Sequence, residues 1–100
     1  MERDLLQALI DSGYADEAGL AATVVCADGV KFLCVSGEVV TLAAGDPPVK
    51  EFSDSIDKLE NLTVKSGLFK KSVSFTHNGK DYALTVKDGK NVVEYFKLIG

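Results

Sequence analysis

The sequence lacks any long apolar run. Its 100 residues are 46% hydrophobic and 26% charged, which is ordinary globular composition. The apolar stretches are far shorter than the ~20 residues that a membrane-spanning helix needs. The first residues, "MERDLLQALIDSGYADE", carry acids where a signal peptide would have a basic region. These absences favour one soluble domain with a cytoplasmic location.

Cysteine and histidine are also scarce. Cys26 and Cys34 are too few for a disulfide scaffold, and with the single His77 they show no metal-ligand spacing, so no metal is expected. A turn at Asp28-Gly29 would place the two cysteines on opposite faces, and we expect two buried, reduced thiols. His77 stands beside an Asn-Gly turn and is expected to face solvent, because catalysis would need a positioned partner.

Positive charge is limited too. The net charge of −4 argues against nucleic acid, whose phosphates demand clustered lysine and arginine. The charge is uneven, since residues 1–50 hold three basic and eight acidic side chains and residues 51–100 hold eight and seven. The phosphate-loop, dinucleotide and nucleophile-elbow motifs are absent. We therefore expect no enzyme and no cofactor.

What the sequence does contain is regular turn punctuation. Pairs such as Asp28-Gly29, Ser36-Gly37 and Asn78-Gly79 recur at roughly 8–12-residue spacing, which is typical of a compact antiparallel β protein. Between the turns lie segments rich in Val, Leu, Phe or Thr. These segments predict seven strands, at residues 20–27, 30–35, 38–44, 49–53, 60–65, 71–77 and 80–86.

The stretch "SVSFTHNGKDYALTV", residues 72–86, predicts a hairpin with one apolar face. Asn78-Gly79 suits a type I′ turn, whose two central residues both need positive φ. That turn places Phe75 opposite Tyr82 and Val73 opposite Leu84. A slip by one residue would bury the polar set, so the turn and the pattern specify the same pairing.

The first three strands have two apolar faces. With turns at Asp28-Gly29 and Ser36-Gly37, one face collects Val25, Val30, Phe32, Cys34 and Val39. The opposite face collects Val24, Leu33, Val40 and Leu42, alongside Lys31 and Glu38. One face should line the core, and the other needs a cover, either the N-terminal helix or a second protomer. Val24, Leu33, Val40 and Leu42 are therefore a candidate protein interface, with a protein partner or an oligomer of this chain as its occupant.

Two amphipathic helices flank the strands. Residues 2–11 carry an apolar stripe of Leu5, Leu6, Leu9 and Ile10. At the other end, Asn91 suits a helix N-cap with Glu94 three residues on, and an apolar face follows at Val92, Tyr95, Phe96 and Ile99. The predicted organisation is an N-terminal helical segment over residues 1–12 and a single domain over residues 20–100.

Residues 56–99 carry a resemblance to a known family. Seven antiparallel strands and one C-terminal helix is the order of the pleckstrin-homology-like (PH-like) barrel. The stretch resembles the second half of bacterial PH-like domains of the YokE-like and GRAM-related group, and "GVKFLCVSGEVVTL" resembles their early hairpin. The residues that match are Ile56, Leu59, Leu62, Val64, Lys65, Gly67, Leu68, Phe69, Val73, Phe75, Tyr82, Leu84, Val92, Val93 and Phe96.

The resemblance implies a fold and a kind of function. The fold would be a mainly β, seven-stranded antiparallel barrel of two near-orthogonal sheets, capped by the C-terminal helix. Such domains bind phosphoinositide headgroups, peptides or proteins, so a non-enzymatic interaction module is implied. The lipid-binding members use a long basic loop between the first two strands. Here that loop is Ala27-Asp28-Gly29-Val30, with only Lys31 nearby, so this lipid site does not carry over.

A second functional hypothesis comes from the lysines of the second half. "SGLFKKS" combines Phe69 with Lys70 and Lys71, and a basic-aromatic loop of this kind can contact anionic lipid. The alternative is a turn whose Phe69 folds into the core beside a solvated charged face. The candidate patch for a membrane or an anionic ligand is Lys65, Lys70, Lys71, Lys80 and Lys87.

Overall fold

The structure is a computed structural model that describes residues 1–17 and 20–99, apart from the side chain of Lys90. This part of the chain is mainly β, with helices α1 (Arg3–Asp11) and α2 (Lys90–Ile99) and a short 3₁₀ turn, η2 (Ile56–Lys58). The strands are β1 (Ala21–Cys26), β2 (Gly29–Ser36), β3 (Val39–Ala44), β4 (Val49–Ser55), β5 (Glu60–Ser66), β6 (Lys71–His77) and β7 (Lys80–Val86). The expected mainly β class, with seven antiparallel strands, an N-terminal helix and a C-terminal helix, is confirmed, although the strands form one sheet rather than two.

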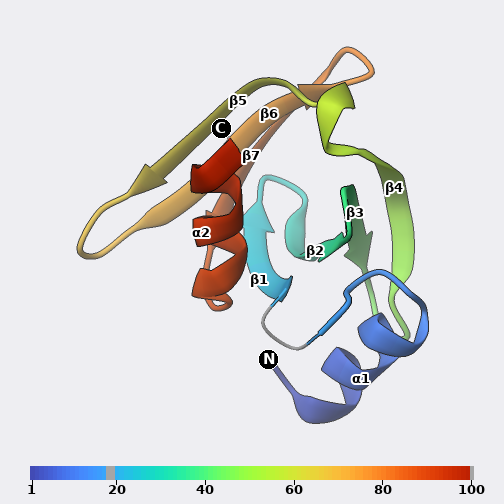
Figure 1. The fold of residues 1–100 in the computed structure, drawn as a ribbon. Helices are drawn as coiled ribbons and strands as arrows, with labels where there is room; N and C mark the ends of the chain where they lie inside the picture. Colours follow the sequence, from blue (N-terminus) through green and yellow to red (C-terminus); the bar gives the residue numbers. More distant parts are fainter. Residues whose placement is uncertain (18–19, 100) are drawn as a thin grey trace.

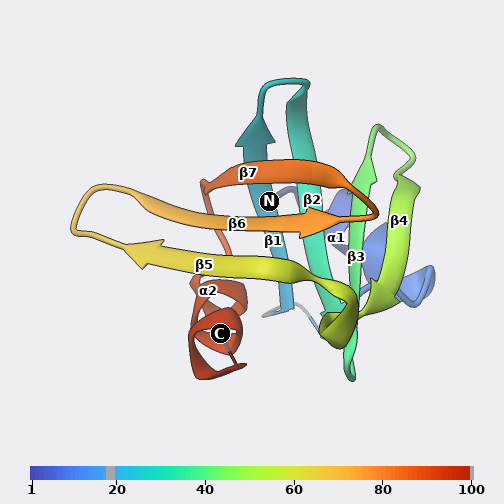
Figure 2. The same ribbon diagram turned by 90° about the horizontal axis from the view of Figure 1, so that it is seen from above.

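The seven strands form one curled antiparallel sheet. Their order is β4-β3-β2-β1-β7-β6-β5, so the first four strands form one half and the last three the other. The halves join through a short β1–β7 pairing, at Val24 with Val86 and Val25 with Thr85. Seen from above, β5–β7 lie across β1–β4, and α2 lies beside β1 (Figures 1 and 2). Strands β4 and β5 are the two edges, which are not hydrogen-bonded to each other.

The predicted β6–β7 hairpin is confirmed. Phe75 pairs with Tyr82 and Val73 with Leu84. Asn78 and Gly79 have φ values of 50° and 79°, as a type I′ turn requires. The alternation of apolar and polar residues therefore holds over the whole hairpin, with one face toward the core and one toward solvent.

The two earlier turns lie one residue away from their predicted positions. Cys26 pairs with Gly29 and Val25 with Val30, so Ala27 and Asp28 form the first turn, rather than Asp28 and Gly29. Likewise Ser36 pairs with Val39, so the next turn is formed by residues 37 and 38. Moving a two-residue turn by one position shifts the pairing by two residues, and a shift of two keeps every side chain on its predicted face.

The prediction of a protein interface on β1–β3 is wrong. Its four residues are all fully buried in the main core, together with Phe96 of α2 and residues of β6 and β7. The physical reason is that the sheet curls, so this face becomes the concave, inner side, which α2 closes. The four residues, which belong to the core and not to an interface, are Val24, Leu33, Val40 and Leu42.

The opposite face of β1–β3 is covered by α1. Leu9 of this helix is fully buried against Phe32, Cys34 and Ala43, in a second apolar cluster on the outer side of the sheet. The alternative that the N-terminal helix covers one face is therefore confirmed, although the face it covers is the one that carries Cys34. Cys34 is buried as expected, whereas Cys26 is only half-buried; both thiols are free.

Helix α2 begins one residue earlier than its predicted cap. Because the helix starts at Lys90, Asn91 lies inside the first turn and is not the N-cap. Val92, Val93 and Phe96 are fully buried, as a helix that closes the sheet requires, but Ile99 is 46% exposed. The expectation that Ile99 faces the core is wrong, because this residue lies at the last position of the helix, past the end of the buried face.

Candidate functional site

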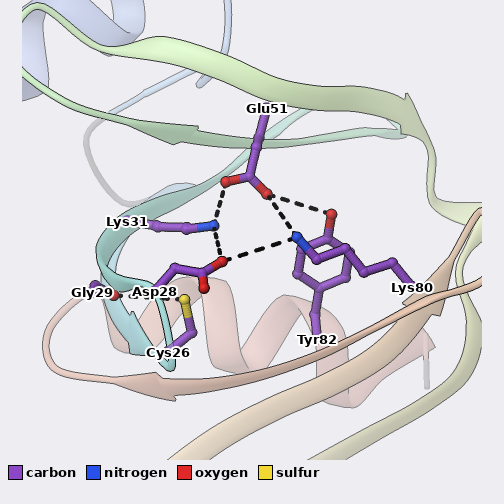
Figure 3. Close-up of polar contacts among 7 residues, drawn as sticks. All are labelled: Cys26, Asp28, Gly29, Lys31, Glu51, Lys80 and Tyr82. Atoms are coloured by element: carbon purple, nitrogen blue, oxygen red, sulfur yellow. Dashed lines mark hydrogen bonds and ion pairs between the residues drawn. The ribbon is translucent and has the colours of Figure 1, made fainter.

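The rim of the half-barrel at the β1–β2 turn holds a charge cluster centred on a buried lysine (Figure 3). Lys31 is only 5% exposed, and its ammonium group contacts the carboxylates of Glu51 and Asp28. Lys80 lies 4.0 Å from both carboxylates, and the hydroxyl group of Tyr82 donates a hydrogen bond of 3.4 Å to Glu51. The cluster thus links β2 and β4 with β7 across the open side of the sheet.

The charges of this rim cluster balance one another. Burial of the Lys31 ammonium acts to lower its pKa, but the hydrogen bonds and the negative charge of Glu51 outweigh burial, so the pKa is raised. Lys31 therefore stays charged and is held by two carboxylates. Since Lys80 faces the same two carboxylates, neither lysine is free to hold an external anion.

A second contact between the halves involves His77. The side chain is 6% exposed, its ring stacks on Phe52 with centroids 4.2 Å apart, and its Nε2 lies 3.1 Å from Asp54 Oδ2. The expectation of a solvent-facing histidine is therefore wrong. The sequence places His77 beside a turn, but only the curl of the sheet brings β4 over the end of β6. We assign this contact to closure of the seam between the two halves.

The loop between β5 and β6 is the most exposed apolar feature. The amide of Gly67 donates a hydrogen bond of 2.9 Å to the carbonyl of Lys70, which closes a four-residue turn. At its tip, Leu68 is 94% exposed and Phe69 is 100% exposed. The alternative in which Phe69 folds into the core is wrong. This loop projects to the left of α2 in Figures 1 and 2.

Four lysines surround this loop: Lys65, Lys70, Lys71 and Lys87. We call these lysines, together with Leu68 and Phe69, the β5–β6 tip. Lys65 is the penultimate residue of β5, Lys71 is the first residue of β6, and Lys70 lies in the turn between these strands. Lys70, Lys71 and Lys87 line one hollow of about 360 Å³ with Phe69 and with Asp88, whose carboxylate is bonded to Thr23 and the Met1 ammonium group. In the described part of the chain, none of the four makes an ion pair, in contrast to Lys31, Lys80 and Lys97.

The predicted anionic-ligand patch is therefore brought together in part. Lys65, Lys70, Lys71 and Lys87 gather at the β5–β6 tip. Lys80 lies beside the β6–β7 turn, at the opposite end of β6, where its ammonium group is 5.0 Å from the ring centroid of Tyr82 and faces the rim cluster. Sequence reasoning missed the exposure of Leu68. The available signal was the pair of turn-forming residues, Ser66 and Gly67, immediately before it.

Within residues 1–17 and 20–99, no group of three or more His, Cys, Asp or Glu side chains is arranged to hold a metal ion. Neither of the helices in this range has the length and apolar character needed to cross a bilayer.

Comparisons of the chain with protein-family models, with curated proteins and with solved structures found no match. The PH-like resemblance stays a prediction.

Proposed function

We propose that this chain is a non-enzymatic interaction module that attaches reversibly to anionic membrane surfaces through its β5–β6 tip. The observation that carries the proposal is the pairing of two fully exposed apolar side chains, Leu68 and Phe69, with four lysines that lack acidic partners. Scattered exposed apolar residues are normal on a protein surface, but two at the end of a projecting turn, ringed by cations, are not.

Charge and apolar burial act together at such a tip. A lysine near an anionic bilayer contributes about 1 kcal/mol, and the attraction extends over a Debye length of about 8 Å at physiological ionic strength. Taking a leucine or phenylalanine side chain out of water contributes about 1.5–3 kcal/mol. The proposal expects binding that weakens in high salt but does not vanish, because the apolar part is not screened.

The net charge of −4 does not oppose this interaction. Beyond a Debye length the carboxylates elsewhere on the molecule are screened, so the local charge at the tip governs contact with a membrane. Anionic lipids are concentrated in the cytoplasmic leaflet, which agrees with the cytoplasmic location expected from the sequence.

Cosedimentation with vesicles tests the proposal. We expect binding to phosphatidylserine-containing vesicles and much weaker binding to phosphatidylcholine vesicles, with at least a ten-fold loss for Leu68→Ser plus Phe69→Ser. Lys70→Glu plus Lys71→Glu should cause a loss of similar size, because two attractions become repulsions.

Matched controls exist on the same chain. Leu98→Ser plus Val49→Ser replaces two apolar side chains that lie away from the tip and are 86% and 68% exposed. Lys50→Glu plus Lys58→Glu reverses the charge of two exposed lysines that lie away from the tip. Both controls should bind as the parent does. Equal losses in the tip variants and their controls, or no vesicle binding by the parent, would overturn the proposal. Binding of a protein through the tip would then be the alternative to pursue.

A further inference from the structure

A groove lies beside the β5–β6 tip on the outward face of strands β5, β6 and β7. Its volume is about 450 Å³, and its polar lining includes Lys65, Lys70, Ser72, Ser74 and Thr85. Val73 and Leu84, which alternate with these strand residues, face the core and are at most 1% exposed. The alternation of the strands therefore fixes the hydroxyl groups on the outer side.

Strand register places a lysine and two hydroxyl residues in one row. Lys65 pairs with Ser72, and Ser72 pairs with Thr85 on the next strand. Directly opposite residues have Cβ atoms about 4.5–5.5 Å apart, so one small ligand can contact neighbours in the row. Lys70 reaches the same groove from the turn, so Lys65 and Lys70 belong to both the tip and the groove.

The hydroxyl groups of this groove lack partners within the protein. In the described residues, Ser72, Ser74 and Thr85 make no side-chain hydrogen bond. Several hydroxyl side chains elsewhere bond within the protein: Thr23 bonds Asp88, Ser36 bonds Asp16, Thr41 bonds Ser53, and Thr76 bonds Asp81. No carboxylate lines the groove either. The groove thus offers hydroxyl and ammonium donors with no internal anion to receive them.

Donors of this kind suit a phosphate group. Phosphate oxygens accept hydrogen bonds from hydroxyl groups and form charge-assisted bonds with lysine. We propose that this groove binds the phosphate of an anionic phospholipid headgroup while Leu68 and Phe69 enter the bilayer. This inference rests on the proposed function, and it adds a defined headgroup site to a general attraction of charge.

The test uses a lipid that does not form vesicles. Dihexanoyl phosphatidic acid below its micellar concentration should shift the amide resonances of Lys65, Lys70, Ser72 and Thr85 in an NMR titration. Ser72→Ala plus Thr85→Val should weaken this binding about ten-fold, because two donors are lost while the lysines and the tip remain. Ser12→Ala, an exposed serine on the α1 side, is the matched control and should leave the affinity unchanged.

Two further measurements test whether the groove prefers a lipid phosphate to free phosphate, and whether it requires an anionic headgroup. Inorganic phosphate should bind at least ten-fold more weakly than the lipid, and dihexanoyl phosphatidylcholine should not compete. Equal affinity for inorganic phosphate would overturn the lipid assignment. An unchanged affinity in Ser72→Ala plus Thr85→Val, or shifts confined to Lys71 and Lys87, would overturn the groove.

Failure of this inference is distinguishable from failure of the proposed function. If vesicles bind through Phe69 and the lysines but the soluble lipid does not bind, the groove is overturned and the membrane tip stands. If the soluble lipid binds in the groove but vesicles do not bind, the membrane function fails, and with it the coupling of groove and tip.

Discussion

At the scale of single residues, the partners of a side chain decide its role more than its type does. Lys31 and Lys70 both carry an ammonium group, but Lys31 is buried between two carboxylates whereas Lys70 is exposed in a turn. His77 is buried although its place beside a turn predicts a solvent-facing side chain, and Phe69 is in water, which is one of its two predicted placements. The burial of His77 follows from the curl of the sheet, which brings Phe52 of β4 onto its ring.

Asp88 is a residue whose contacts predict an effect of pH on stability. Its carboxylate accepts hydrogen bonds from the amide and the hydroxyl group of Thr23, at 2.8 and 2.9 Å, and from the Met1 ammonium group at 2.9 Å. Burial acts to raise the pKa of Asp88, but these hydrogen bonds outweigh it, and the pKa is lowered from the ordinary value of 3.8.

We predict that Asp88→Asn lowers the free energy of unfolding by about 1 kcal/mol at pH 7, since the carboxylate is partly exposed and its charged hydrogen bonds are discounted accordingly. Because the folded-state pKa lies below the unfolded one, the stabilisation is complete above about pH 5 and is lost as the pH falls through the folded-state pKa. Urea titrations at pH 7 and at about pH 2.5 should therefore show a difference that shrinks in acid.

The control for this prediction is Glu60→Gln, which removes one charge at an exposed position of β5. It should change stability little at either pH. A deficit of Asp88→Asn that stays the same from neutral to acidic pH would show that the charge of Asp88 is not what stabilises the fold.

At the scale of secondary-structure elements, the junction of β7 and α2 packs closely against β1. Gly89 has a φ of 83°, and a Cβ atom there would lie 2.7 Å from the carbonyl oxygen of Ala21 and from Ala22. Gly79, in the β6–β7 turn, has a similar φ of 79° but open space around it. Comparing substitutions at the two glycines therefore distinguishes the cost of backbone strain from the cost of a steric clash.

We predict that Gly79→Ala costs about 1–2 kcal/mol, the usual penalty for a side chain in the left-handed region. Gly89→Ala should cost about 2 kcal/mol more, because the added methyl group must displace the backbone of β1. Chemical denaturation of both variants measures the difference. Equal costs would mean that α2 can move away from β1 freely, contrary to the packing described above.

At the scale of the whole molecule, two covers complete a sheet that does not close on itself. Helix α2 closes the concave side and α1 covers the outer face of β1–β3. The side chains of Phe52, His77 and the rim cluster span the seam between the edge strand β4 and the β6–β7 hairpin. The tip and its groove lie outside all of these contacts.

Cys34 reports whether α1 stays in place. Burial raises the pKa of its thiol to about 12, and no part of the residue is exposed. In a Cys26→Ser background, we predict that Cys34 does not react with an aromatic disulfide reagent at pH 8 in the folded protein, because the reactive thiolate is absent and inaccessible.

Leu9→Ala should expose this thiol. Loss of a fully buried leucine costs about 2–5 kcal/mol, so the reaction rate of Cys34 should rise at least ten-fold. Leu98→Ala removes the same atoms from a side chain that is 86% exposed, and should leave the rate unchanged. A fast reaction of Cys34 in the parent would show that α1 does not cover the sheet.

The local sequence was sufficient for the strands and the hairpin but not for the burial of particular faces. Asn78-Gly79 and the alternation around it specify the β6–β7 pairing because turn geometry and side-chain period agree. The first two turns lie at residues 27–28 and 37–38, one residue from the positions that the sequence predicts, since Asp-Gly and Ser-Gly allow more than one two-residue turn. Each strand residue still lies on its predicted face, because the side-chain period is two.

By itself, the sequence determined the order of elements, the two faces of each strand and the presence of a basic-aromatic turn, because these depend on neighbours within a few residues. Only the tertiary structure decided which face of β1–β3 became the core, where His77 lies, and that Lys80 is separated from the other patch lysines. Those outcomes depend on the direction in which the sheet curls, and curl brings together residues that are distant in the chain.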